Sequence, residues 1–264
     1  MKTRIVSMVA LLTIGLGGAN ASTISGSFVQ QQVFNADLTA QGTTDWAVWG
    51  QGASTSLSPT DSKSGGTAIG DLTRYSNGDP ARGLGQFGNY GASSFMWSDG
   101  TNSASASGVW AGIQNWSSYD YPYGNCTVAT GTNSCGEGFS FTVAAGTDLQ
   151  ELVVYNDVHG GTATLTATLS DGSAPVYTED MTLFGTNLPY ISTIDFAAAS
   201  EGQYLTIQIL LDTDGAGGTA NVAVQAAAVS RVDSPTPEPG TMLLAGLGML
   251  GAGAFARRRK SAAR

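Results

Sequence analysis

Residues 162–169 read Thr-Ala-Thr-Leu-Thr-Ala-Thr-Leu, with threonine at every even position and alanine or leucine at every odd one. This period of two places polar side chains on one face of an extended chain and apolar side chains on the other. Apolar residues also alternate at 139–143, 205–211 and 222–226, and Gly, Asp, Asn or Ser bounds each run. The pattern predicts half-buried strands separated by turns.

Shorter apolar runs extend this pattern over most of the chain. They predict further strands at 23–29, 33–38, 45–49, 95–98, 109–116, 151–155 and 191–196. Residues 51–66 are rich in Ser, Thr and Gly and predict a loop. Away from the two ends, no window has the period of an amphipathic helix. The sequence therefore predicts an all-β fold, an antiparallel β-sandwich of jelly-roll type, over residues 22–234.

The composition restricts the partners that this domain can have. The chain has 264 residues, 36 of them glycine, and a formal net charge of -9. Residues 22–234 hold 19 acidic and 4 basic residues, a net charge of -15. An acidic domain without a basic stripe has no surface for a phosphate backbone, so we expect no nucleic-acid partner.

The N-terminus has the three parts of a secretory signal. Two basic residues precede an apolar stretch at 5–16, and Ala19 and Ala21 then supply small residues at the -3 and -1 positions of a cleavage site. This order predicts a signal peptide at residues 1–21, handled by the Sec translocon and signal peptidase. The alternative is a buried N-terminal helix, which three glycines at 15, 17 and 18 disfavour.

The C-terminus combines a Pro-rich spacer, an apolar segment and a basic run. Residues 241–256 carry no charge, and Arg257, Arg258 and Arg259 follow them. Sixteen helical residues span about 24 Å, which is short of the roughly 30 Å hydrocarbon core. By the positive-inside rule, the basic run stays in the cytoplasm and the large domain lies outside the inner membrane.

These residues resemble the PEP-CTERM sorting signal. The similarity rests on Pro237-Glu238-Pro239, the apolar helix at 241–256 and the basic run after it, within residues 235–264. The resemblance implies an exosortase partner that cuts near the Pro-Glu-Pro motif and passes the protein outward, commonly in bacteria that make exopolysaccharide. Prolines keep the spacer out of helices and sheets, so a protease cleft can accept it. A plain C-terminal membrane anchor is the alternative.

Three blocks in the middle of the chain resemble uncharacterised exported bacterial β domains. They are residues 38–50, 97–101 and 169–174. In that pattern a His often stands where this chain has Val48. The resemblance implies a sandwich and no established chemistry.

The two cysteines, Cys126 and Cys135, are nine positions apart. In an exported protein such a pair predicts a disulfide that closes one loop, contributing about 2–3 kcal/mol. A metal site would need further soft ligands, and a catalytic thiol would need a base nearby in the sequence.

Enzymatic motifs are missing from the sequence. It has no Gly-x-Ser-x-Gly, His-Glu-x-x-His or phosphate-loop motif. The single histidine, His159, stands before two glycines, where an exposed turn is expected. Two facing carboxylates of a glycosidase would leave no sequence signature. We expect a protein that is not an enzyme and needs no cofactor.

Calcium is the one metal that the sequence suggests. Asp212 and Asp214 stand in an Asp-x-Asp-Gly motif, which is typical of loops that bind hard cations. The third ligand and the Glu of an EF-hand do not follow. The alternative is a polar turn between two strands.

Aromatic residues are dense between positions 75 and 123. We expect Trp46, Trp49, Trp97 and Trp110 to fill the core, as single strand tryptophans do in sandwiches. The set formed by Trp116, Tyr119, Tyr121 and Tyr123 lies among polar residues and predicts an exposed patch. Sugar rings stack on such rings, so the patch is a candidate glycan-binding site.

Together these features predict an exported, exosortase-processed protein. It would be held transiently in the membrane and then reach the cell surface or an exopolysaccharide matrix, with a non-enzymatic structural or interaction role. A lectin-like carbohydrate-binding module is the alternative, and a calcium-dependent adhesin is the third.

Overall fold

The computed structural model describes residues 21–31, 34–76, 83–87, 93–116, 136–183, 189–214 and 220–232. Within these ranges the chain is almost entirely β, with one helical turn, α1 (Leu38–Gln41), and one 3₁₀ turn, η1 (Gln51–Ala53). The strands are β1 Thr23–Gln30, β2 Asn35–Asp37, β3 Asp45–Val48, β4 Asp61–Ser62, β5 Thr73–Tyr75, β6 Leu84–Gln86, β7 Ser94–Trp97, β8 Ala106–Val109, β9 Ile113–Trp116, β10 Gly138–Ala145, β11 Gln150–His159, β12 Gly161–Leu169, β13 Tyr177–Leu183, β14 Tyr190–Ala197, β15 Gln203–Asp214 and β16 Asn221–Arg231.

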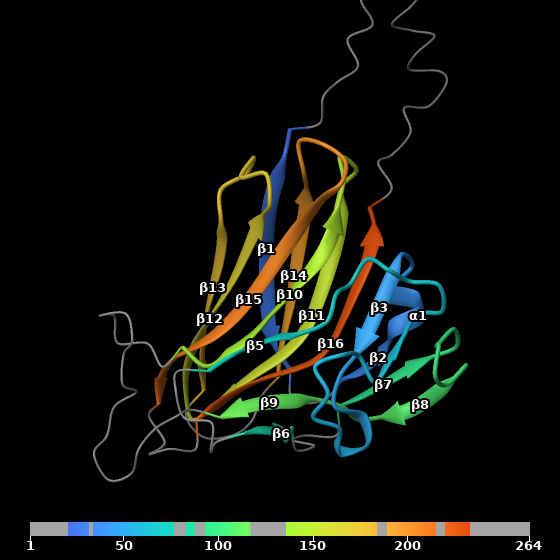
Figure 1. Ribbon diagram of the computed structural model, residues 1–264, viewed down its shortest axis with the longest axis vertical. Helices are drawn as coiled ribbons and strands as arrows, with labels where there is room; N and C mark the ends of the chain where they lie inside the picture. Colours follow the sequence, from blue (N-terminus) through green and yellow to red (C-terminus); the bar gives the residue numbers. More distant parts are fainter. Residues whose placement is uncertain are drawn as a thin grey trace, which may run out of the picture. The chain divides into compact units, whose positions relative to one another are not determined.

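Eight of these strands form the two layers of a sandwich (Figure 1). One layer has the order β9-β16-β11-β14, and the other has the order β10-β15-β12-β13. All pairings within these layers are antiparallel. From β9 to β16 the chain changes layer at every step except the β12–β13 hairpin, which is the connectivity of a jelly roll. The predicted fold class is confirmed.

Strand β12, which contains the alternating residues 162–169, shows why the two layers pack together. In β12 every odd residue, Gly161 to Leu169, is buried and every threonine is only half-buried. The same alternation holds over most of β14 and β15. The inward side chains of both layers form one apolar core, in which Leu165 and Ile207 from one layer join Leu152 and Ile194 from the other.

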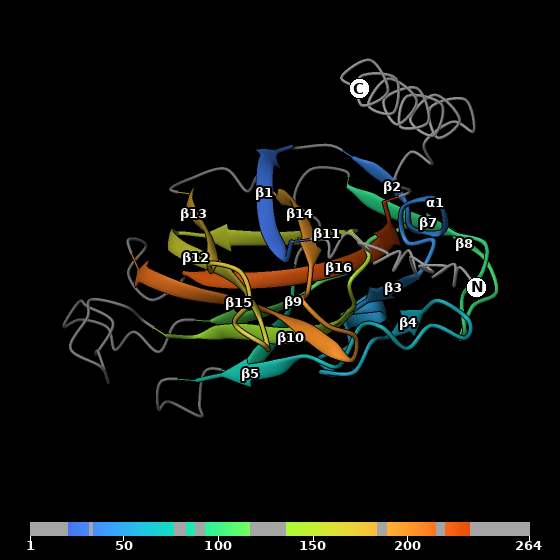
Figure 2. The ribbon, with the colours of Figure 1, turned by 90° about the horizontal axis from the view of Figure 1, so that it is seen from above.

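A third layer covers the outer face of the sheet that contains β16. It consists of α1 and a small sheet in which β2 pairs parallel with β7 and β7 pairs antiparallel with β8 (Figure 2). A second apolar cluster fills the space between this layer and β3, β11 and β16. Its largest members are aromatic rings in contact: Trp46 packs tilted against Trp97 at 5.2 Å, and Phe95 packs edge-to-face against Tyr155 at 5.1 Å, between ring centroids.

A β-bulge directs β16 into both cores. The register of β16 against β11 shifts at Tyr155/Asn156 and leaves Gln225 as the extra residue. Val222 and Val224 before the bulge contribute to the sandwich core, whereas Ala226 after it belongs to the outer cluster. A bulge changes the face to which the following side chains point. The small alanines of β16 leave room for the large rings packed against them.

Most strands predicted from short apolar runs are present, and several regions differ. The strand predicted at 109–116 is interrupted, because β8 ends at Val109 and β9 begins at Ile113. Of residues 34–38, only those of β2 form a strand, because the Asp37 carboxylate accepts a hydrogen bond from the Ala40 backbone N–H (3.1 Å) and begins α1. Strand β13 was not predicted, because Glu179 and Asp180 interrupt its apolar pattern. The loop predicted at 51–66 contains only η1 and the short β4.

Trp110 corrects the prediction for the core tryptophans. Trp46, Trp49 and Trp97 are buried as expected, but Trp110 is 41% exposed. It follows β8 and precedes β9, so no sheet covers it.

The chain divides into two units after Arg231, and the second unit is Val232–Arg264. Only Val232 of that unit belongs to the described residues, so the predicted helix at 241–256 lies outside them. Within the described ranges, no helix has the length and hydropathy needed to cross a bilayer.

Candidate functional site

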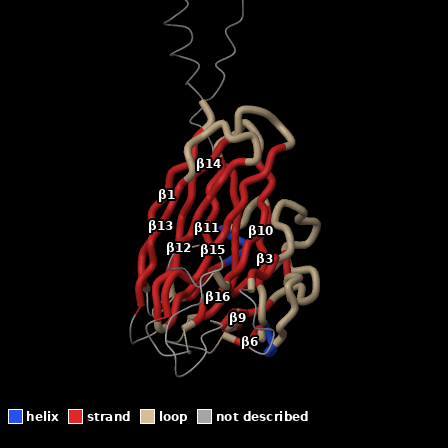
Figure 3. The backbone as a smooth tube through the Cα atoms, turned by 60° about the vertical axis from the view of Figure 1, so that its left-hand side comes forward, coloured by secondary structure: helices blue, strands red, loops and turns tan. Residues whose placement is uncertain are grey.

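The strand register defines two ends of the sandwich, and different residues lie at each. Thr23 at the start of β1 lies opposite Ala197, and Gln150 lies opposite both Phe196 and Arg231. The first described strand therefore begins, and the last one ends, at the same end of the sandwich, which we call the terminal end. The opposite end, which we call the distal end, holds β6 and β9 (Figure 3). With about 3.3 Å per residue, the ten residues of β11 separate these ends by roughly 30 Å.

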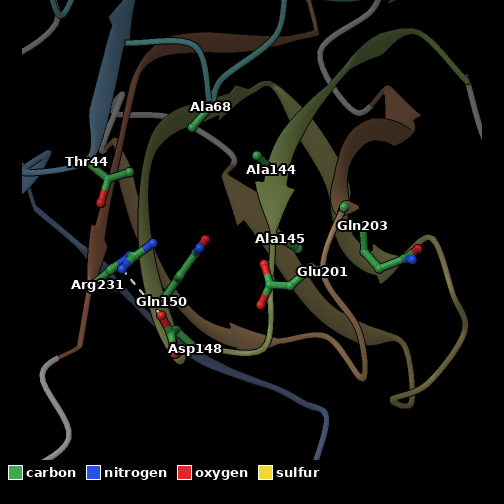
Figure 4. A pocket seen from close by; sticks show the side chains of 11 residues that line it. Thr44, Ala68, Ala144, Ala145, Asp148, Gln150, Glu201, Gln203 and Arg231 are labelled. Carbon is green, nitrogen blue, oxygen red and sulfur yellow. Dashed lines mark ion pairs between the residues drawn. The ribbon is translucent and has the colours of Figure 1, made fainter. Parts of the chain in front are cut away.

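The terminal end contains a pocket of about 280 Å³ (Figure 4). Alanines at 68, 144 and 145 form part of its wall, and Asp148, Glu201 and Arg231 supply its charges. The Arg231 guanidinium lies 3.4 Å from the Asp148 carboxylate, and both side chains are more than 60% exposed. Such exposed pairs add little stability.

Glu201 is the best-held group of this pocket. Its Oε1 accepts hydrogen bonds from the Thr147 hydroxyl (2.6 Å) and the Thr147 backbone N–H (2.9 Å). These bonds lower the pKa of Glu201 below its ordinary value. Glu201 is therefore an ionised carboxylate at neutral pH, and the described lining of the pocket contains no aromatic ring.

The distal end contains the first residue of the predicted aromatic patch. Trp116 is the last residue of β9 and is half-buried. It lies opposite Asn221, which in turn lies opposite His159 on β11. Gln114 is on the same face of β9 as Trp116, two residues earlier. The register thus places an indole, two amides and an imidazole on one face of the sheet.

A glycine permits the position of the Trp116 ring. A Cβ atom on Gly85 of β6 would lie 2.9 Å from the indole Nε1 of Trp116 and 3.1 Å from the amide nitrogen of Gln114. The missing side chain lets both groups lie against the backbone of β6. Asp157 is on the same strand face as His159 and is fully buried, and this burial raises its pKa well above the ordinary value. Burial therefore disfavours the charged form of the carboxyl beneath this surface.

Most other predicted site residues lie outside the described residues. These are Tyr119, Tyr121 and Tyr123 of the aromatic patch, Cys126 and Cys135 of the disulfide, Ala19 of the cleavage site, and Pro237, Glu238, Pro239, Arg257, Arg258 and Arg259 of the sorting signal. Ala21, the first described residue, is exposed. His159, expected in an exposed turn, is the half-buried last residue of β11.

Asp212 and Asp214 belong to a strand and not to the loop that the sequence suggested. Both lie in β15, and Asp212 occupies the bulge between β15 and β12. One oxygen of Asp212 accepts a hydrogen bond from the Thr164 hydroxyl (2.7 Å). Burial raises the pKa of Asp212. In the part of the chain that the structure describes, no three His, Cys, Asp or Glu side chains are grouped to hold a metal ion.

Three aspartates hold the loops that join the third layer to the sandwich. Both oxygens of Asp45 accept backbone hydrogen bonds, one from Trp46 and the other from Ala68 and Ile69. Asp61 accepts four backbone N–H bonds, from residues 62, 101, 102 and 103, at 2.9 to 3.1 Å. Carboxylates in such positions replace the backbone partners that irregular loops lack.

The third aspartate, Asp99, joins two of the blocks noted in the sequence. It accepts hydrogen bonds from the Thr39 hydroxyl (2.7 Å) and the Trp46 indole N–H (2.9 Å), and it pairs with Lys63. Burial alone would raise the pKa of Asp99, but these hydrogen bonds lower it. Sequence reasoning assigned no role to these aspartates, although Asp45 and Asp99 stand in those blocks.

Replacement of Asp61 by alanine should destabilise the fold substantially. Asp61 is 1% exposed, so its loss removes the acceptor of the partly buried N–H groups of Ser62, Asn102 and Ser103. We expect Asp61→Ala to lower the free energy of unfolding by about 3 kcal/mol in urea denaturation. Asp37→Ala is the matched control, because it removes a single exposed helix cap at a cost of about 1 kcal/mol. Equal losses for the two variants would contradict the role given to Asp61.

A buried polar network joins the two layers of the sandwich. Glu179 of β13 is 3% exposed, and its Oε1 accepts a hydrogen bond from the Ser192 hydroxyl of β14 (2.8 Å). Ser192 accepts one from the Asn156 amide of β11 (3.1 Å), and the Tyr177 hydroxyl lies 3.4 Å from Glu179 Oε2. Burial raises the pKa of Glu179 to about 6, against the opposing effect of these hydrogen bonds.

The raised pKa predicts a pH dependence of stability. A carboxyl with a higher pKa in the folded state stabilises the fold fully below its unfolded pKa, and this stabilisation is lost as the pH rises through about 6. From pH 4 to pH 8, the free energy of unfolding of the wild type should fall by about 2 kcal/mol relative to that of Glu179→Gln. Urea denaturation measures both. Glu201→Gln, which removes a group of lowered pKa, should show the opposite sign. A constant difference between wild type and Glu179→Gln across this range would contradict the prediction.

The comparison with known families concerns the C-terminus. Residues 235–260 match the family model of the PEP-CTERM protein-sorting motif. A search of curated proteins with the whole sequence finds no match.

Proposed function

We propose that this PEP-CTERM protein is a non-enzymatic component of the cell surface or of an exopolysaccharide matrix, and that its jelly roll is an interaction module. The sorting motif at 235–260 is the observation that carries the proposal. It indicates an exported protein that an exosortase processes, and it implies delivery to the cell envelope or surface. The signal peptide predicted at 1–21 would start that export.

The arrangement of the domain supports this role. Both ends of the described domain, at residues 21–23 and 231–232, lie at the terminal end. The sorting motif follows the second of these ends in the sequence, so the distal end carries neither connection to the rest of the chain.

Substitution of the Pro-Glu-Pro motif tests the sorting step. Replacing Pro237, Glu238 and Pro239 together by alanine should leave unprocessed protein in the membrane fraction, because helical alanines remove the extended segment that a protease accepts. Mass spectrometry of the membrane and secreted fractions measures this, and also reports the N-terminus and the state of Cys126 and Cys135. As a control, alanines at Ser234 and Thr236 should leave processing unchanged. An unchanged mature mass in the triple variant would refute the sorting role.

Glycan recognition at the distal end is the second candidate function. Trp116 is half-buried there, beside the amides of Gln114 and Asn221, and the segment with Tyr119, Tyr121 and Tyr123 follows it directly. Both amides are buried, with Gln114 7% and Asn221 2% exposed, so a sugar would meet the half-buried indole and the segment that follows it. Stacking on an indole suits a neutral glycan. Placement opposite the terminal end would make this surface available to a polysaccharide.

Loss of the indole should weaken such binding. We expect Trp116→Ala to reduce retention on the native exopolysaccharide by about tenfold or more, since stacked aromatic contacts and their buried area contribute at least about 1.4 kcal/mol. Trp110→Ala is the matched control, because Trp110 is an exposed tryptophan outside this face. Repeating the assay with a chelator tests for calcium dependence. If Trp116→Ala binds as the wild type does, or no glycan binds at all, this function is excluded.

A further inference from the structure

Strand β1 is a long sheet edge without the usual protection against pairing. It pairs with β14 over all eight residues, and no other strand among the described residues pairs with it. Its sequence, Thr-Ile-Ser-Gly-Ser-Phe-Val-Gln, has no charge, no proline and no bulge. Residues 25–30 are all exposed, including Phe28 (44%) and Val29 (55%). An edge of this kind presents unpaired N–H and C=O groups to another strand.

The other edges of the described sheets are short or guarded. Strands β2, β4, β5, β6 and β8 have two to four residues each. Strand β13 is long, and it lies next to β1 at one margin of the sandwich (Figure 3). It carries the exposed Asp180 and the inward-pointing Glu179, and inward charges are a known protection of sheet edges. In the described part of the molecule, β1 is thus the long edge that lacks such protection.

The charge distribution favours a second copy of the same chain as the partner of β1. Residues 22–234 carry a net charge of -15, so most surfaces of two copies repel each other. β1 is a neutral strip on this acidic domain, and identical neutral strips can approach without that repulsion. Phe28 already packs against Tyr190 on one side, with 5.5 Å between ring centroids, and leaves its other side exposed.

We propose that two copies of this protein associate through antiparallel pairing of their β1 strands. A two-fold axis perpendicular to the strands relates the copies, and the two sheets that contain β14 become one continuous sheet. Each copy offers one such edge and uses it in the pair, so the association closes at a dimer. The backbone groups of β1 that point away from β14 gain partners, and Phe28 and Val29 become covered.

The antiparallel arrangement has a geometric consequence. Because the axis reverses the strand direction, the terminal end of one copy lies beside the distal end of the other. The dimer therefore presents a distal end in each of two opposite directions. The pairing of β1 does not depend on the proposed sorting function.

Lysines on the outward face of β1 test the proposal. Ser27 and Val29 are exposed and point away from the sandwich core, so Ser27→Lys with Val29→Lys places four like charges at the two-fold interface. We expect the dissociation constant of the dimer to rise about 100-fold or more. Sedimentation equilibrium of the full chain in a density-matched detergent solution measures it. Thermal denaturation checks that the variant is folded.

Thr178→Lys with Thr182→Lys is the matched control. Both threonines are exposed on the neighbouring edge strand β13, so this variant has the same number of added charges. It should dimerise as the wild type does. Three outcomes would each overturn the proposal. The wild type could stay monomeric even at 100-fold the protein concentration used for denaturation, the β1 variant could still dimerise as the wild type does, or both variants could lose the same dimer affinity. These outcomes differ from a failure of sorting, which the mass of the mature protein reports.

Discussion

Strand β16 is buried on both faces, and the rest of the architecture follows from that constraint. Its first nine residues are all buried, although an outer strand of a two-layer sandwich exposes every second side chain. The jelly-roll core covers one face of β16, and the aromatic cluster of the third layer covers the other. The bulge at Gln225 and the small alanines after it make room for Trp46 and Tyr155. Without the third layer, this sheet would expose a large apolar surface to water.

The third layer is irregular, and carboxylates hold it where strands do not. Asp45 and Asp61 each accept several backbone hydrogen bonds from connecting segments, and Asp99 joins α1 to β3 through Thr39 and Trp46. Some of the acidic residues of the domain therefore have a structural role, in addition to their effect on solubility. Inside the sandwich, Glu179 has the opposite character, because burial disfavours its charged form. Aspartates thus hold the connecting segments, whereas a glutamate buried between the sheets opposes folding at neutral pH.

The alternation of single strands could be recognised in the sequence, and the partners of each strand could not. In β12 and β15 one face is polar, so the period of two is visible. In β13, Glu179 points inward and interrupts the pattern, so the strand escaped prediction. Trp110 was expected in the core because tryptophan usually is, but its place between two strands leaves it exposed. Of the predicted site residues, the structure describes Ala21, Trp116, Asp212 and Asp214, and it shows that both aspartates belong to a strand.

The sequence by itself determined the fold class, because the spacing of apolar residues is a local property of an extended chain. It also determined the sorting motif, which is contiguous in the sequence, so the match to it needs no tertiary context. Only the tertiary structure decided which residues meet across the sheets: the Glu179 network, the three loop-holding aspartates, the setting of Trp116 beside Asn221, and the unguarded edge at β1. Those features depend on strand order and register. Many strand orders are compatible with the same alternation, and packing of the complete set of strands selects one of them.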